Sequence, residues 1–407
     1  MPFLTSGPVS GELFYDRQRE LDDLLAAVQS LKTDVPKYYA LLGMRKVGKT
    51  SLLVEFARRL VNEPSVVVVH VDCHESAIDP AIFFQDYAIA VLDAFLDALG
   101  HTLEIGTLRG ARLDEADFLA RLGRVQALGL RSMERGVRAL LTLRAGRDHR
   151  EAFHAIADLP EAVAVEAGLH TIAILDEFQA VGRLNLFKDV RTTIADIFQF
   201  LRSKWQRQRR VMYVISGSEI SLLEQTIHRE QAPFFQHFLT LRLREFPPAE
   251  AQRMMATLFA QAGYPVDQVL IDEMVSRFNG HPFYLQVLGE ELCRAANDPA
   301  IAGITPALYK TVAQETLLGQ GGRLYLYFQG MYERLVGSAA SLAQALIAVA
   351  HGHHTLGQVA RELRRGSNVV SSWLRRLVEA DVLVKEQGGY RFADPVFALW
   401  VQGTRPP

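Results

Sequence analysis

Short, almost wholly apolar runs alternate with amphipathic segments through the first part of the chain. These runs are residues 38–42, 66–71, 171–175 and 211–215. Unbroken apolar runs of this length are typical of strands buried on both faces of a parallel sheet. Residues 51–60 carry apolar side chains at helical spacing, and residues 239–243 alternate leucine with polar residues, which favours a strand nearer an edge. The pattern predicts an α/β fold with a doubly wound parallel sheet.

The character of the sequence changes after Pro247-Pro248. Residues 249–318 contain no strand-like run and predict several short helices, and the glycine-rich stretch 319–322 favours a connection. Farther on, the pattern predicts three helices and then a strand-like piece after Gly388-Gly389. The predicted segments are an α/β core over residues 1–246, a helical subdomain over 247–318, a linker over 319–337 and a C-terminal module over 338–407.

Composition is that of an ordinary globular protein. The 407 residues are 49% hydrophobic and 22% charged, which excludes extensive disorder, and the formal net charge of −2 excludes a uniformly basic nucleic-acid coat. Cys73 and Cys293 stand far apart without metal-ligand spacing, so we expect no disulfide framework. Neither a signal-peptide pattern nor an apolar run near the roughly 18 residues of a membrane span is present. We expect a cytoplasmic protein with no membrane partner.

A phosphate-binding loop follows the first apolar run. The segment from Gly43 to Thr50 matches G-x-x-x-x-G-K-[ST] between a predicted strand and a predicted helix, which is the context that this motif requires. The two glycines let successive N–H groups turn toward one anion, and the helix dipole favours negative charge there. We expect Lys49 to neutralise the terminal phosphates of ATP and the Thr50 hydroxyl to bind Mg²⁺. The predicted nucleotide-binding residues here are Gly43, Met44, Arg45, Lys46, Val47, Gly48, Lys49, Thr50 and Ser51.

Two adjacent carboxylates end the apolar run at residues 172–175. Neighbouring side chains diverge at a strand's carboxyl end, so one can approach a metal while the other faces the γ-phosphate. We assign Asp176 to Mg²⁺ and Glu177 to the attacking water, and with Lys49 they are the predicted catalytic residues. An acidic pair alone is also typical of surface carboxylates that close a strand. The phosphate loop favours the catalytic interpretation.

The apolar run at residues 211–215 ends in the small polar residues Ser216-Gly217-Ser218. If its strand lies between the strand before the phosphate loop and the strand that ends at Asp176, Ser216 or Ser218 can hydrogen-bond to the γ-phosphate. A plain Ser-Gly turn is the alternative interpretation.

Together these motifs resemble the prokaryotic archaeal-type ATPase family, a branch of the signal-transduction (STAND) P-loop ATPases related to AAA+ proteins and origin-recognition initiators. The resemblance runs over nearly the whole chain. It is carried by FYDRQREL at 14–21, MRKVGKTSLL at 44–53, LDEFQ at 175–179, GS at 217–218, GHPFYLQ at 280–286, and YRFADP at 390–395 with Trp400. It implies an ASCE-type core with the strand of Ser216 between the other two, a helical lid and a C-terminal winged helix.

The resemblance also assigns residues outside the phosphate loop. It implies that Phe14 and Arg17 lie near the adenine, and that His281 and Pro282 close over the nucleotide from the lid. For Phe14 the alternative is simple packing of the N-terminal arm. For His281 it is a cap or packing role at a helix start.

The chain departs from the family pattern where an arginine finger is expected. Residues 234–238 read FFQHF where family members usually carry a Gly-Arg pair, and Arg229 and Arg244 are weaker substitutes. A finger can be worth roughly 10³ to 10⁵ in rate, so its absence implies slow hydrolysis without a partner. Slow turnover suits a switch better than a motor.

The long interval between Thr50 and Asp176 predicts a mostly helical insertion over about residues 79–166. Four of its arginines recur at helical spacings of seven, four and three: Arg124, Arg131, Arg135 and Arg138. They form either a solvated or salt-bridged face, or a docking surface for DNA or an acidic partner.

The C-terminal module reads as helix, turn, helix and hairpin, with Thr355 as an N-cap. Residues 338–407 hold eight basic and five acidic residues, a balance of +3 that leaves −5 for the rest of the chain. The exposed side chains expected on its second helix, where DNA or a protein partner can dock, are Ser371, Ser372, Arg375 and Arg376. The nearby histidines 351, 353 and 354 lack further ligands at metal spacing, which favours a surface loop.

Three functional hypotheses follow from these patterns. The first is a Mg²⁺-ATP-dependent regulatory ATPase switch with slow hydrolysis, whose protomers associate according to nucleotide state. The second is an ATP-dependent, DNA-binding protein, initiator-like or a transposition helper, that uses the winged helix. The third is a partner-sensing component of a defence module, which the sequence neither supports nor excludes.

Overall fold

The computed structural model describes residues 2–406 except 78, 102–119, 121, 126–127, 147–148, 185–196, 229, 231, 302 and 338. The chain divides into two compact units. The sheet unit comprises Arg17–Gly43 and Lys49–Leu243, and the helical unit comprises Met1–Asp16, Met44–Gly48 and Arg244–Pro407. We describe each unit by itself.

Five parallel strands form the sheet of the sheet unit, in the order β2-β3-β4-β1-β5. They are β1 (Tyr38–Leu42), β2 (Val66–Asp72), β3 (His170–Asp176), β4 (Val211–Gly217) and β5 (Phe238–Arg242). Every residue of β3 and β4 is buried, as the unbroken apolar runs predict. Leu239 of the edge strand β5 is 52% exposed. The predicted parallel α/β fold is confirmed.

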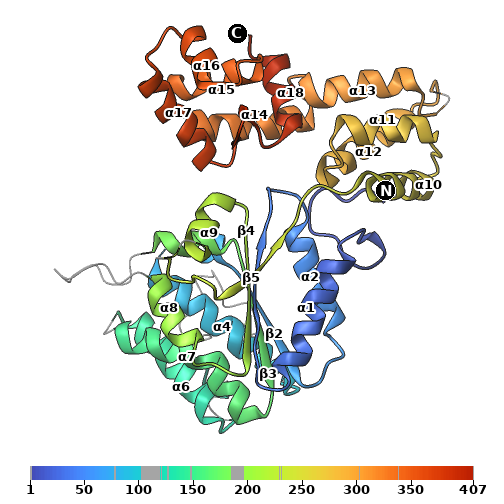
Figure 1. The fold of residues 1–407 in the computed structure, drawn as a ribbon. Coiled ribbons are helices and arrows are strands. Elements are labelled where there is room, and N and C mark those ends of the chain that lie inside the picture. Colours follow the sequence, from blue (N-terminus) through green and yellow to red (C-terminus); the bar gives the residue numbers. More distant parts are fainter. Residues whose placement is uncertain are drawn as a thin grey trace. The chain divides into compact units, whose positions relative to one another are not determined.

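Helices lie on both faces of this sheet (Figure 1). On one face are α1 (Gln18–Leu31) and α2 (Lys49–Arg59), and on the other are α4 (Pro80–Ala98), α7 (His149–Ala167) and α8 (Ile197–Trp205). The remaining helical elements of the unit are α3 (Cys73–Ser76), α6 (Arg131–Arg144), η3 (Phe178–Arg183) and α9 (Ile220–Ile227). The two helical layers shield both faces of the central strands from water.

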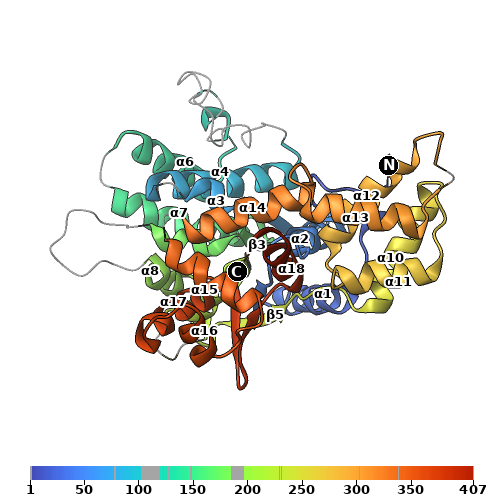
Figure 2. The same ribbon diagram turned by 90° about the horizontal axis from the view of Figure 1, so that it is seen from above.

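The predicted insertion over about residues 79–166 supplies one of these layers. Helices α4, α6 and α7 lie side by side (Figure 2), and their apolar side chains belong to the same core as β2 and β3. Gly136 sits within α6 without breaking it. A Cβ at this position would lie 2.8 Å from Leu159 Cδ1, so the glycine lets α6 approach α7 closely. Parts of the predicted insertion lie outside the described residues.

The helical unit is built from short helices, as the sequence after Pro247-Pro248 predicts. In chain order they are η1 (Gly11–Leu13), α10 (Pro248–Gln261), α11 (Gln268–Arg277), α12 (Pro282–Ala296), α13 (Pro306–Leu318), α14 (Arg323–Val336), α15 (Ala340–Ala350), α16 (Leu356–Glu362), α17 (Ser367–Glu379) and α18 (Pro395–Thr404). Figure 2 shows α10 beside α11 and α12 beside α13. One hydrophobic cluster extends from Phe3 through α10–α15 to Val401, so these helices share a single core.

The predicted linker over residues 319–337 is wrong for most of its length. Only the turn at 319–322 is irregular, and Arg323–Val336 forms α14. Leu324, Phe328 and Tyr332 follow at intervals of four and are buried in the core of the helical unit. This spacing places them on one helical face, and their burial outweighs the glycine signal that suggested a connection.

The last part of the chain has the predicted helices and a hairpin. Thr355 caps α16 in a capping box with Gln358, and α17 follows after a short turn. Strands β6 (Leu383–Glu386) and β7 (Gly389–Phe392) pair antiparallel. That these elements make a winged helix stays a prediction.

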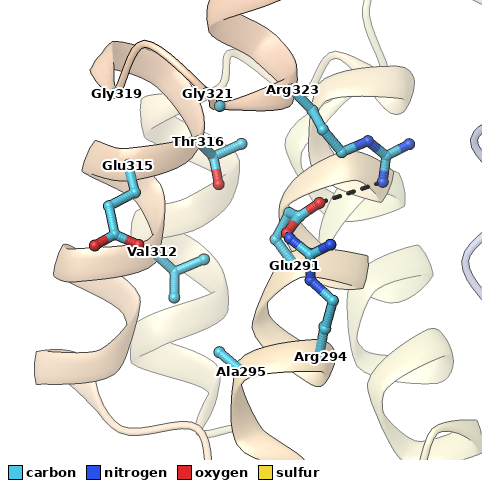
Figure 3. Close-up of a pocket in the computed structure, with 10 residues that line it drawn as sticks. Glu291, Arg294, Ala295, Val312, Glu315, Thr316, Gly319, Gly321 and Arg323 are labelled. Atoms are coloured by element: carbon cyan, nitrogen blue, oxygen red, sulfur yellow. Dashed lines mark hydrogen bonds and ion pairs between the residues drawn. The ribbon is translucent and has the colours of Figure 1, made fainter.

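A cavity of about 370 Å³ lies in the helical unit between α12, α13 and the turn at 319–322 (Figure 3). Arg294 and Arg323 both reach Glu291 at its wall, and Arg323 Nη1 also donates to Glu290 Oε2 at 2.5 Å. The two arginines at the cavity wall are thus paired with carboxylates of the same unit. Separately, none of the helices that the structure describes is long and apolar enough to cross a membrane.

Candidate nucleotide site

The phosphate loop connects β1 to α2 in the predicted order of strand, loop and helix. Gly48 has φ +105°, a conformation that side chains rarely adopt, so a glycine is required there. The other left-handed residue of the loop is Lys46, with φ +62°. The expectation for Gly48 is met, whereas Gly43 does not supply the second left-handed position.

Lys49 and Thr50 open α2 at the carboxyl edge of the sheet. Lys49 is buried, and its Nζ donates to the backbone O of Gly43 at 2.9 Å, so the ammonium group reaches back across the start of the loop. Thr50 Oγ1 donates to Asp176 Oδ2 at 2.8 Å. The two halves of the predicted site therefore lie together within the sheet unit.

The order of the strands explains why Asp176 and Ser216 meet. Because β4 lies between β3 and β1, the end of β4 is next to the ends of both other strands, as the family resemblance implies. The Ser216 hydroxyl donates to Asp176 Oδ1, and both side chains are buried. Thr50, Asp176 and Ser216 thus form one hydrogen-bonded row, which we call the carboxylate row.

Glu177 diverges from Asp176, as expected at the end of a strand. Its backbone is left-handed, with φ +52°, and its N–H donates to Asp176 Oδ1 at 3.0 Å. Its carboxylate Oε2 accepts from Ser218 Oγ at 2.7 Å and from Gln179 Nε2 at 2.5 Å. The two serines that the sequence offered as alternatives therefore contact different carboxylates.

Gln179 is the site residue that sequence reasoning missed. It is buried, and it lies two positions after Glu177 within the LDEFQ segment that was singled out only as a family motif. A polar side chain in the first turn after a catalytic strand was the available signal. Only the turn of η3 reveals that the amide folds back onto Glu177.

The buried thiol of Cys73 lies near these carboxylates. Burial raises its pKa well above the ordinary value, and the negative charges of Asp176, Asp72 and Glu177 raise it further. The thiol is therefore protonated at neutral pH. Cys73 and Cys293 are both free, which agrees with the expected lack of a disulfide.

Phe14 and Arg17, expected near the adenine, belong to different units. Phe14 is half-buried in the helical unit and its N–H donates to Gly11 O at 3.1 Å. Arg17 is buried at the start of α1 with φ +66°, and its Nη1 lies 3.9 Å from Glu20 Oε1. Contact of either residue with a nucleotide stays a prediction.

His281 and Pro282 begin α12, as the resemblance implies for a helix start. The His281 ring is buried and stacks on Tyr284, with 3.8 Å between ring centroids. Tyr284 in turn donates its hydroxyl to Asp394 Oδ2 at 2.6 Å. Packing inside the helical unit thus accounts for the buried His281 ring, and a role over the nucleotide stays a prediction.

The four arginines of the predicted basic face are exposed. Three of them lie on α6, whose opposite face buries Met133, Val137 and Leu140. Within the described part of the chain, no ion pair with a carboxylate involves Arg124, Arg131, Arg135 or Arg138. A salt-bridged face is therefore excluded for those neighbours that the structure describes, and a solvated face or a docking surface remains.

On α17, Arg375 and Arg376 are exposed, whereas Ser371 and Ser372 are half-buried. The Ser372 hydroxyl donates to Val369 O at 2.7 Å. Of the two substitutes for an arginine finger, Arg244 is exposed and Arg229 lies outside the described residues.

A phosphate loop before α2, carboxylates at and directly after the end of β3, and an intervening β4 are the features of a P-loop ATPase. The chain belongs to the family described as an ATPase domain predominantly from Archaea, whose model matches residues 14–288. Membership of the archaeal-type ATPase family is thereby confirmed, and the strand of Ser216 lies between the other two as the resemblance implies. The helical lid and the winged helix stay predictions.

Two solved structures show the same fold over almost the whole chain. The Walker-type ATPase PABY2304 of Pyrococcus abyssi has a TM-score of 0.68 at 18% identity, covering 99% of this chain and 100% of that one. The ORC2 protein of Aeropyrum pernix, in ADPNP-ADP complexes, has a TM-score of 0.59 at 13% identity, covering 98% and 97%. Comparison with functionally curated proteins found no match.

Proposed function

We propose that the chain binds Mg²⁺-ATP and hydrolyses it slowly as a nucleotide-dependent regulatory switch. The observation that carries the proposal is the carboxylate row beside Lys49. Together with Lys49 it brings an ammonium group, two hydroxyls and a carboxylate to the carboxyl ends of β1, β3 and β4. This set of groups suits phosphoryl transfer, which depends on positioning and on neutralising phosphate charge.

The residues present fit a magnesium ion. Thr50 and Asp176 offer a hydroxyl and a carboxylate oxygen within 2.8 Å of each other, and Mg²⁺ prefers such hard oxygen ligands. Thr50 would hold the ion directly and Asp176 through its water shell. The bound ion would neutralise charge on the phosphates.

Lys49 and Glu177 would have separate roles in hydrolysis. Lys49 would leave its hydrogen bond to Gly43 O and pair with the terminal phosphates. Glu177 would orient and deprotonate the attacking water. The missing Gly-Arg pair at residues 234–238 supports slow turnover, and slow turnover supports a switch of the signal-transduction class over a motor.

ATP binding is tested by titration calorimetry with the wild-type chain and Lys49→Ala. We expect about 10- to 100-fold weaker binding, because a charge-assisted bond to phosphate is lost. Lys37→Ala is the control, since this exposed lysine precedes β1 at the opposite edge of the sheet. Equal affinity of the Lys49→Ala and wild-type proteins would rule the proposal out.

The switch is tested separately by hydrogen–deuterium exchange and light scattering with ADP and with a non-hydrolysable ATP analogue. We expect exchange in the helical unit to differ between the two nucleotides, with association of protomers in one state. Identical exchange and identical mass with both nucleotides would exclude the switch and indicate an ATPase without nucleotide-dependent changes.

A second candidate, DNA binding through the C-terminal module, is favoured by the exposed Arg375 and Arg376 on a helix of a +3 segment. Such arginines contact phosphates or base edges when a helix enters a groove. Binding to duplex DNA would fall steeply with salt and with the double change Arg375→Ala and Arg376→Ala. Arg364 and Arg365 are exposed in the turn before α17. Comparing the double change Arg364→Ala and Arg365→Ala with the α17 variant shows whether α17 itself contacts the DNA. No binding at low salt, with or without ATP, would remove this candidate.

A further inference from the structure

The carboxylate of Glu177 is anchored through one oxygen. Its Oε2 accepts two hydrogen bonds, from Ser218 Oγ at the end of β4 and from Gln179 Nε2 in η3. Within the described chain, no group donates to Oε1 of Glu177. The carboxylate therefore has one fixed oxygen and one oxygen left to act on a ligand.

The side-chain amide of Gln179 is tightly packed against its neighbours. A Cβ at Gly217 would lie 2.4 Å from Gln179 Oε1 and 2.9 Å from Leu223 Cδ2, so only glycine leaves room for the amide. Gln179 Oε1 is itself buried without a hydrogen bond from the described residues. A buried acceptor without a donor is unfavourable, and in the reversed amide the oxygen would face the Glu177 carboxylate. The Gln179 side chain is thus held in the orientation in which its NH₂ group donates to Glu177, although its carbonyl oxygen then has no donor among the described residues.

The backbone of Glu177 points to the same constraint. A non-glycine residue at φ +52° is unfavourable, and such a conformation persists where surrounding contacts determine it. Here the contacts are the Glu177 N–H bond to Asp176 and the two donors on Oε2. Contacts from the end of β3, from η3 and from the residue after β4 therefore fix where the carboxylate lies.

We propose that Gln179 and Ser218 are positioning residues for ATP hydrolysis: they hold Oε2 of Glu177 so that Oε1 faces the attacking water. The inference rests on the proposed function and deepens it. Oε1 takes a proton from water as the water oxygen bonds to the γ-phosphorus and the bond from that phosphorus to the ADP oxygen breaks. ADP leaves with that electron pair, and the proton passes to the phosphate product. Gln179 and Ser218 act only through Glu177 and touch neither water nor ATP.

The test compares Gln179→Leu and Ser218→Ala with the wild-type chain in ATP binding and in single-turnover hydrolysis. We expect each change to lower the hydrolysis rate about 5- to 30-fold while the Kd for ATP stays within threefold, because one of two hydrogen bonds to the carboxylate is lost. Ser218→Thr keeps the hydroxyl and should retain most of the rate. Gln179→Met, a second apolar side chain of similar length, is measured in parallel so that a single misfolded variant does not decide the result.

The Glu177→Gln background separates positioning from general damage. If Gln179 acts through Glu177, Gln179→Leu should cause no further loss of rate in Glu177→Gln protein. The same 5- to 30-fold loss in that background, or full activity of folded Gln179→Leu and Ser218→Ala proteins, would overturn the inference alone. Hydrolysis by Glu177→Gln at the wild-type rate would instead overturn the proposed role of Glu177, and the inference with it.

Discussion

The hydroxyl of Thr50 donates to Oδ2 of Asp176 at 2.8 Å, although 126 positions separate the two residues in the sequence. The bond joins the first turn of α2, which follows β1, to the end of β3, and β4 lies between β1 and β3 in the sheet. It places the two predicted metal ligands together before any ion is considered. A ligand pair arranged in advance in this way costs less to order when the ion binds.

The Thr50–Asp176 pair predicts a magnesium-dependent effect of Thr50→Ala. With Mg²⁺ present, we expect ATP to bind about 10- to 100-fold more weakly, because a metal ligand and a bond to Asp176 are both removed. In EDTA the variant and the wild-type protein should bind ATP alike. Calorimetry under both conditions measures the difference, with Thr50→Ser as the control that keeps the hydroxyl. Equal losses with and without Mg²⁺ would argue against a metal role for Thr50.

The turn before α14 predicts unequal effects of two neighbouring glycine substitutions. A Cβ at Gly322 would lie 2.2 Å from the backbone O of Glu315, whereas nothing lies within 4 Å of a Cβ at Gly321. We expect Gly322→Ala to lower the free energy of unfolding by about 1–3 kcal/mol, since backbone atoms must move apart. Gly321→Ala should change it by less than about 0.5 kcal/mol. Urea denaturation of both variants checks this, and equal stabilities would contradict the close approach.

Asp394 predicts a pH dependence of stability in the helical unit. Burial raises the pKa of its carboxyl, although the Tyr284 hydroxyl and two backbone N–H groups oppose the shift. The folded state therefore binds the proton more tightly than the unfolded state. The stabilisation is complete below the unfolded pKa of about 4 and is lost as the pH rises through the folded pKa.

Asp394→Asn tests this pH dependence, because asparagine can still cap α18 and contact Tyr284 but cannot ionise. We expect the stability of the variant relative to wild type to rise as the pH increases from about 4. Hydrogen exchange of α18 and β7 between pH 4 and 8 provides the local measurement. A difference that stays constant across this range would mean that the raised pKa of Asp394 does not affect folding.

Burial of both thiols predicts that the native protein resists thiol reagents. Burial is the largest cause of the raised pKa of Cys73, and it raises the pKa of Cys293 to about 11. The thiolate is the reactive form, so neither residue should react at pH 7 until the chain unfolds. Labelling with a chromogenic disulfide should count no thiols in the native protein and two in denaturant. Rapid native labelling of Cys73 would indicate opening beside the carboxylate row.

Local sequence patterns predicted most of the fold. Continuous apolar runs marked the strands, and Pro247-Pro248 marked the change to a helical region. The linker prediction failed at α14 because a glycine-rich turn is a local signal, whereas the burial of Leu324, Phe328 and Tyr332 depends on helices distant in the chain. For the same reason, the layer formed by α4 and α7 was expected only as an insertion.

By itself the sequence determined the phosphate loop, the acidic end of β3 and the classes of group that a P-loop ATPase needs, because spacing within a few residues specifies them. Only the tertiary structure decided which serine meets which carboxylate, since β4 must lie between β3 and β1 before Ser216 can reach Asp176. It also decided the place of Gln179, whose contact with Glu177 depends on the turn of η3 and on the space left by Gly217. The contact of Ser216 with Asp176 and the approach of Gln179 to Gly217 join segments distant in the chain, and hydrophobic periodicity does not encode the order in which strands assemble.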